Sequence, residues 1–180
     1  RTKKVKMRQL NSIFILILLL SFSNLLRAQN DYQEFKLFGQ IFHKETTIKD
    51  VSVKVSLNDS IIYTDESNFN GKFKLKLVTN KSYRIDFSKD KYITKTVIVN
   101  IYSQDSTEIK PFAFDIELVQ QRDFRYVEVP GDLGEVAHLY YDEEKEALSW
   151  DKQYTQEAHE TIKNLQELNK AKRYEKYSRF

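Results

Sequence analysis

The sequence predicts a mainly β protein, a seven-stranded antiparallel β-sandwich followed by a short hairpin region and a C-terminal α-helix. Two patterns support this fold class. Short runs of alternating apolar and polar residues fill the stretch 35–120, and a period of two is typical of strands with one buried face. From Asp151 onwards the apolar residues recur at helical spacing instead. With 41% hydrophobic and 31% charged residues, the chain has the composition of a globular protein.

The strand candidates are seven short runs separated by turn-forming residues such as Asn70-Gly71. The clearest have an apolar residue at every second position and are 51–57 and 73–77. The others are 35–42, 61–64, 83–87, 97–101 and 112–118. Because no helical period intervenes, strands at this spacing favour an antiparallel sandwich of two sheets over 35–120.

The region 121–150 is less regular. Residues 136–141 and 147–150 could pair as a hairpin around the acidic run 142–146, which is typical of a solvated loop.

A C-terminal helix and basic tail are predicted over 151–180, with Asp151 as a suitable N-cap. The apolar stripe of this helix consists of Tyr154, Ala158, Ile162, Leu165 and Leu168. Residues 169–180 hold five basic residues against one acidic residue.

Residues 1–28 have the pattern of a secretory signal peptide, with a basic segment, an apolar run over 13–20 and a small residue, Ala28. Eight residues of helix rise only about 12 Å, whereas a bilayer span needs roughly 20 apolar residues. We expect cleavage after Ala28, so that the mature chain begins at Gln29 and has no transmembrane span. The alternative is an uncleaved signal anchor.

Charge and composition argue against several functional classes. Six of the 29 basic residues precede Gln29, which leaves 23 basic against 26 acidic residues and removes the electrostatic case for a nucleic-acid partner. The lack of cysteine excludes disulfides, thiol catalysis and thiolate metal sites. The sequence holds no nucleophile elbow, phosphate loop or zinc-ligand motif, so we expect a non-catalytic protein without a cofactor.

Metal binding is not expected either. No metal-ligand spacing relates the three histidines, His43, His138 and His159. The first positions of a calcium loop are matched by Glu66, Asn68, Asn70 and Gly71. The twelfth position, where a bidentate carboxylate belongs, is Leu77, so an ordinary hairpin turn explains this segment better.

Four segments resemble the carboxypeptidase-regulatory-like domain, a transthyretin-like (prealbumin-like) sandwich. They are a Gly-x-Ile strand end, a Val-x-Val strand, an Asn-Gly-Lys-Phe turn and a Tyr-x-Ile strand, at 39–42, 50–55, 67–73 and 83–92. This sequence departs from the family pattern in Ser67-Asn68, where Thr-Asp is usual, and in Lys91, which replaces the glycine before Tyr92. The resemblance implies an accessory, non-catalytic module, and an exported protein of the Bacteroidetes envelope that is periplasmic or outer-membrane-associated.

Two functional interpretations remain open. The first is a non-catalytic scaffold or accessory subunit that binds a cell-envelope protein through the hairpin region and the helix stripe. The second is a carbohydrate- or other ligand-binding module that uses exposed aromatic residues such as Phe38, Phe42, Tyr63 and Tyr92. The two are distinguished by whether those rings share one concave, exposed patch.

Two serines are candidates for O-glycosylation. Ser60 and Ser106 each follow an aspartate in a predicted turn and resemble the acceptor pattern of Bacteroidetes O-glycosylation. Ordinary turn chemistry is the alternative explanation.

Overall fold

The structure, a computed structural model, describes residues 32–103 and 109–178. The chain divides into two units, and the architecture below is that of the second unit, Gln33–Phe180. The signal peptide expected over 1–28 and the candidate acceptor Ser106 lie outside the described residues.

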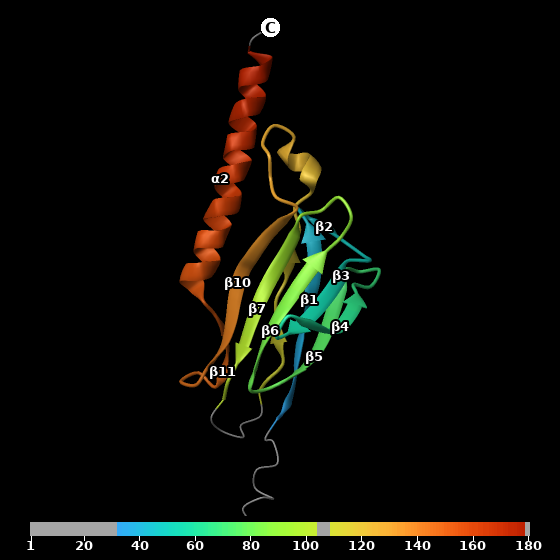
Figure 1. Cartoon of the computed structure of the whole chain (residues 1–180), viewed down its shortest axis with the longest axis vertical. Coiled ribbons are helices and arrows are strands. Elements are labelled where there is room, and N and C mark those ends of the chain that lie inside the picture. Colours follow the sequence, from blue (N-terminus) through green and yellow to red (C-terminus); the bar gives the residue numbers. More distant parts are fainter. Residues whose placement is uncertain (1–31, 104–108, 179–180) are drawn as a thin grey trace, which may run out of the picture. The chain divides into compact units, whose positions relative to one another are not determined.

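Within these residues eleven strands form two sheets (Figure 1). The smaller sheet is built around β1 (Glu34–His43), which pairs antiparallel with β2 (Thr46–Thr47) and β5 (Lys72–Val78). On its other side β1 pairs parallel with two short strands, β8 (Phe112–Ala113) and β9 (Ile116–Glu117).

The larger sheet has the order β11-β10-β7-β6-β3-β4. In chain order its strands are β3 (Ser52–Leu57), β4 (Ser60–Glu66), β6 (Lys81–Ser88), β7 (Thr94–Ile101), β10 (Asp132–Asp142) and β11 (Ala147–Trp150). All neighbours in this sheet are antiparallel except β10 and β7, which run parallel.

The predicted alternation identifies the buried faces of β5, β6 and β7 correctly. The inward residues of β5, β6 and β7 join one hydrophobic core, which includes Phe73, Leu75, Leu77, Tyr83, Ile85, Phe87, Val97, Val99 and Ile101. Strand β4 is also found where it is predicted, but every residue in it is exposed, because it forms the open edge of the larger sheet.

The prediction of seven antiparallel strands is not reproduced. In the run 112–118 the buried positions are as expected, with Phe114, Ile116 and Leu118 inward, but the run forms two short strands parallel to β1. The hairpin predicted within 136–150 is present as β10 and β11, and β10 extends the larger sheet beside β7. Parallel neighbours come from distant segments without a tight turn, so no local signal marks them.

Left-handed turns account for the segments that resembled family or metal motifs. The side-chain oxygen of Asn68 accepts hydrogen bonds from the backbone N–H groups of Asn70 (2.9 Å) and Lys72 (3.0 Å), and Gly71 has φ +72°. The calcium-like spacing therefore belongs to a turn held by the Asn68 side chain. This turn connects β4 to β5, which lie in different sheets, so the expectation of a hairpin turn here is wrong. Lys91 has φ +67°, which explains why the related pattern carries glycine there.

The C-terminal helix α2 (Lys152–Tyr177) begins where it is predicted, since Asp151 accepts a hydrogen bond from the backbone N–H of Tyr154 (3.0 Å). It contacts β10 and the short 3-10 helix η1 (Gln121–Phe124). Strand β11 pairs only with residues 139–142 of β10, and α2 lies against the preceding part of that strand. In the part of the chain that the structure describes, no helix combines the length and apolarity of a bilayer span.

Candidate functional site

The first two thirds of α2 pack on their own chain. Four of the five stripe residues predicted to bind a partner are half-buried, and they are Tyr154, Ala158, Ile162 and Leu165. The Tyr154 ring stacks on the imidazole of His138 in β10, with 3.7 Å between ring centroids, and its hydroxyl donates to the backbone oxygen of Glu135 (3.2 Å). A partner would have to displace the helix to reach these four residues.

Leu165 and Asn169 attach the middle of α2 to the segment around η1. Leu165 packs against a second hydrophobic cluster that is built on Ile93, Val119 and Phe124. The Asn169 side chain accepts a hydrogen bond from the Tyr126 backbone N–H and donates one to the Asp123 backbone oxygen, both at 2.8 Å. Leu168, the fifth stripe residue, is 47% exposed.

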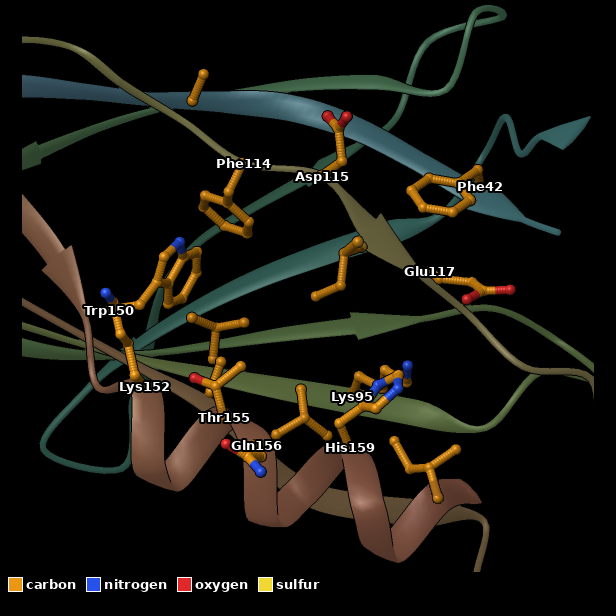
Figure 2. Close-up of a pocket in the computed structure, with 16 residues that line it drawn as sticks. Phe42, Lys95, Phe114, Asp115, Glu117, Trp150, Lys152, Thr155, Gln156 and His159 are labelled. Carbon is orange, nitrogen blue, oxygen red and sulfur yellow. The ribbon is translucent and has the colours of Figure 1, made fainter. Parts of the chain in front are cut away.

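A groove of about 720 Å³ lies beside the first half of α2 (Figure 2). Its walls come from the two sheets and from α2. It lies at the side of the sandwich where β9 of the smaller sheet and β10 of the larger sheet do not pair with each other. The apolar lining includes Phe114, Ile116 and Trp150, and Trp150 meets the Phe114 ring edge to face at 5.3 Å between centroids. This volume is in the range of small-molecule sites.

One charged side chain of this groove occupies an inward position. Lys95 has the same strand parity as Val97 and Val99 in β7, and it is only 8% exposed. Figure 2 shows it in the groove lining, with His159 of α2 at the same end. Burial lowers the pKa of the Lys95 ammonium, and the charge of Glu117 opposes that effect.

The nearby carboxylates do not pair with this lysine. Asp115 accepts a hydrogen bond from the Gln40 backbone N–H (2.9 Å), and Glu117 accepts one from the Lys44 backbone N–H (3.1 Å). Among the described residues, no hydrogen bond or ion pair reaches the Lys95 ammonium.

A second polar surface lies where α2 meets the segment after η1. The side chains of Tyr126 and Tyr177 approach with 3.3 Å between their hydroxyl oxygens, and the Lys176 ammonium lies 5.6 Å from the centre of the Tyr126 ring. The hydrogen bond with Tyr126 lowers the pKa of Tyr177, and the charges of Lys176, Arg173 and Arg125 lower it further. We call Arg125, Tyr126, Arg173, Lys176 and Tyr177 the basic–aromatic patch.

The four aromatic residues proposed for sugar stacking do not share one patch. Phe38 and Phe42 are on β1, whereas Tyr63 is on β4 at the outer edge of the other sheet. Tyr92 contacts the ring of His43 edge to face and accepts a hydrogen bond from Gln120 (2.6 Å). Only Phe42 of the four lines the groove. This scatter removes the observation on which the carbohydrate interpretation depended.

The remaining sequence candidates have ordinary surroundings. His43 contacts Asp123 at 3.4 Å, and His138 contacts Glu135 at 3.0 Å. In the two described ranges, no group of three or more metal-binding side chains is placed to hold an ion. Ser60 is exposed at the start of β4, so the hydroxyl proposed for glycosylation is accessible.

Sequence reasoning missed the groove and Lys95. The sequence did contain a signal for Lys95. Extended two residues toward the N-terminus, the strand predicted from Val97 places this charged residue on the same face as the apolar Val97 and Val99. The groove itself depends on contacts between β9, β10 and α2, which are distant in sequence.

No protein-family model matches this chain, and no curated protein matches it. Among solved structures, a DUF3823 family protein from Parabacteroides merdae is 15% identical, with 48% of this chain and 46% of that chain covered and a TM-score of 0.37. Catechol 1,2-dioxygenase from Acinetobacter is 9% identical over 57% of this chain and 59% of that chain, with a TM-score of 0.39. A minor pilin from Streptococcus agalactiae is 14% identical over 55% and 46%, with a TM-score of 0.31. This chain therefore spans less than two thirds of each of these proteins, and the similarities carry no information about activity.

Proposed function

We propose that the protein is a non-catalytic accessory subunit of the cell envelope that binds an acidic segment of a partner protein through the basic–aromatic patch. The observation that supports this proposal most is that the patch brings together three exposed basic residues and two tyrosines. Tyr126 comes from the segment after η1 and Tyr177 from the end of α2. Arginine and tyrosine are enriched where proteins bind one another, and a cluster of one charge sign favours a partner of the opposite sign.

The position of the patch on the helix supports this function. Asn169 attaches α2 to the body, and residues 170–178 are all exposed beyond it. An isolated amphipathic helix is marginal in water, but this end continues a helix that is already held by packing, so it presents its side chains at little ordering cost.

The envelope location is supported by the leader-like pattern of 1–28 and by the resemblance of 35–120 to the carboxypeptidase-regulatory-like domain, which accompanies other modules as an accessory part. The partner in this proposal is a periplasmic or outer-membrane protein. The stripe residues in contact with the chain's own sandwich are left out of the interface.

The test is capture of partners from the envelope fraction of the source organism with the tagged full chain. The triple variant Arg125→Glu, Arg173→Glu and Lys176→Glu should lose the proteins that the unaltered chain retains. Binding to the unaltered chain should weaken as salt rises from about 0.05 to 0.5 M, because the interacting charges are exposed.

The matched control is Lys36→Glu, Lys72→Glu and Lys74→Glu, which makes the same charge change at exposed positions of the smaller sheet. This control should keep the partners. Equal loss in both triple variants, or retention in the patch variant, would contradict the assignment, as would capture of anionic vesicles or nucleic acid in place of a protein.

A further inference from the structure

The groove beside α2 contains a charged side chain, Lys95, for which residues 32–103 and 109–178 provide no hydrogen bond or ion pair. Charged side chains are rarely buried unless paired, because their removal from water is costly. The Lys95 residue is more than nine-tenths buried, and the described residues offer its ammonium no hydrogen bond or ion pair. The ammonium nitrogen itself is not among the fully buried unpaired atoms of those residues, so it keeps contact with solvent. An apolar residue would fill this inward position of β7 at lower cost, which makes the lysine a candidate for a binding role.

The surrounding acids do not form an ion pair with this lysine, although the charge of Glu117 partly offsets the cost of its burial. Asp115 and Glu117 lie in the same lining, but each carboxylate accepts a hydrogen bond from a backbone N–H group of the β1–β2 segment. The Lys95 ammonium therefore remains in the groove lining as a cation and hydrogen-bond donor.

The rest of the groove lining is mainly apolar, which indicates that a ligand bound at Lys95 would also have an apolar part. Phe114, Ile116 and Trp150 form an apolar surface on one side, and Ile162 of α2 lies on the other. Sites of this kind, with apolar walls and a few convergent polar groups, bury most of a small ligand and orient it by the polar contact.

We propose that this groove binds a small amphipathic monocarboxylate, with its carboxylate at Lys95 and its apolar body against Phe114 and Trp150. A carboxylate completes the hydrogen bonding of the lysine and neutralises its charge. A single acidic group is inferred because Lys95 is the one basic side chain of the lining that is buried, whereas Lys152 is exposed. The site is separate from the basic–aromatic patch, so either proposal can fail alone.

Trp150 provides a local probe, since it is the only tryptophan of the chain and lies in the groove. Dodecanoate, titrated below its micellar concentration, should change the tryptophan fluorescence of the full chain in a saturable way. Dodecanol has the same apolar body without the charge, and it should bind at least about tenfold more weakly, as expected for loss of a charged hydrogen bond.

The variant Lys95→Met should remove the preference for the acid, with dodecanoate weakened about tenfold or more and dodecanol little changed. Lys95→Arg keeps the charge and should keep the preference, which also controls for loss of the fold. Lys74→Met, at an exposed position of β5, is the matched control and should bind as the unaltered chain does.

Three results would overturn the proposal. They are absence of saturable binding, equal affinity of the unaltered chain for dodecanoate and dodecanol, and undiminished dodecanoate binding by Lys95→Met. Stronger binding of an apolar peptide with a free C-terminal carboxylate than of dodecanoate would assign the groove to a protein partner and would also overturn it.

Discussion

At the scale of single residues, Gly39 fixes how closely β1 approaches the segment that follows β8. A Cβ atom at this position would lie 1.6 Å from the backbone oxygen of Phe114 and 2.7 Å from its carbonyl carbon. Both are backbone atoms of a buried residue, so a rotamer change would not relieve the clash. The glycine in the Gly-x-Ile motif is therefore required by packing.

The variant Gly39→Ala should lower the free energy of unfolding by about 2 to 3 kcal/mol, because β1 and its parallel neighbours must separate to admit the methyl group. Urea denaturation measures this change. Gly131→Ala is the control, since nothing lies within 4 Å of a Cβ built there, and it should change stability by less than about 0.5 kcal/mol. Equal effects of the two substitutions would contradict this explanation.

Lys95 makes the stability of the protein depend on pH. Burial lowers the pKa of its ammonium in the folded state from the ordinary value of 10.5, and the charge of Glu117 partly opposes this. Between the two pKa values the unfolded chain binds a proton that the folded chain has released, so stability rises with pH there. Below the folded pKa the cost of burying the charge is fully present.

Lys95→Met should therefore stabilise the ligand-free protein at pH 7 by about 1 to 2 kcal/mol, the order of an unpaired buried polar group. The gain should shrink as the pH approaches 10.5. The other titratable groups that face Lys95 are Asp115 and Glu117 from the opposite wall and Lys152 and His159 from α2, and they are common to both proteins. Urea midpoints from pH 7 to 10.5 check this, and a gain that is constant over the range would contradict it.

At the scale of elements, α2 has two parts, one that packs on its own chain and one that is exposed to solvent. Residues 152–162 of α2 form one wall of the groove, and Leu165 and Asn169 attach the helix to the segment around η1. After Asn169 it carries the exposed basic end. Helical periodicity predicted the apolar stripe, but an apolar stripe does not indicate whether the covering surface belongs to the same chain.

Two truncations separate these parts. Deletion of 152–180 should lower the free energy of unfolding by about 3 kcal/mol, since three large side chains lose roughly half of their burial. Deletion of 170–180 should leave stability within about 0.5 kcal/mol and abolish partner capture. Thermal unfolding and capture of each truncated chain test this. If the chain without 152–180 keeps full stability, the packing of α2 on its own chain is unimportant, and the apolar stripe would again be the expected partner interface.

At the scale of the whole molecule, local patterns predicted the inward faces and the N-cap of α2. The alternation at 73–77 and 83–87 places Leu75 and Ile85 in the core, as the structure does. Strand partners were predicted less well, because β7 meets β10 across more than 30 residues and their parallel ladder has no turn between them. The groove depends on the same distant pairing, so it could not be read from local periodicity.

This pairing also revises where the folding unit ends. The sequence predicts a sandwich confined to 35–120, but the core includes Ala137 and Leu139 of β10 and Leu148 of β11, all buried. A chain that stops at residue 120 lacks these side chains and leaves the backbone edge of β7 unpaired, which favours association with other chains.

We therefore expect a fragment of residues 33–120 to aggregate or unfold without cooperativity, whereas 33–150, which retains β10 and β11, should unfold cooperatively. Removing β10 with Leu139 and β11 with Leu148 exposes apolar neighbours in the core, including those on β7, at about 1.5 to 3 kcal/mol for each large side chain lost from the core. Ultracentrifugation and urea denaturation of the two fragments measure this difference. If 33–120 is monomeric and as cooperative as 33–150, the β10–β11 hairpin is an addition to a self-sufficient sandwich. The stabilisation from burying the core of 33–120 would then outweigh the conformational entropy cost of folding without the hairpin.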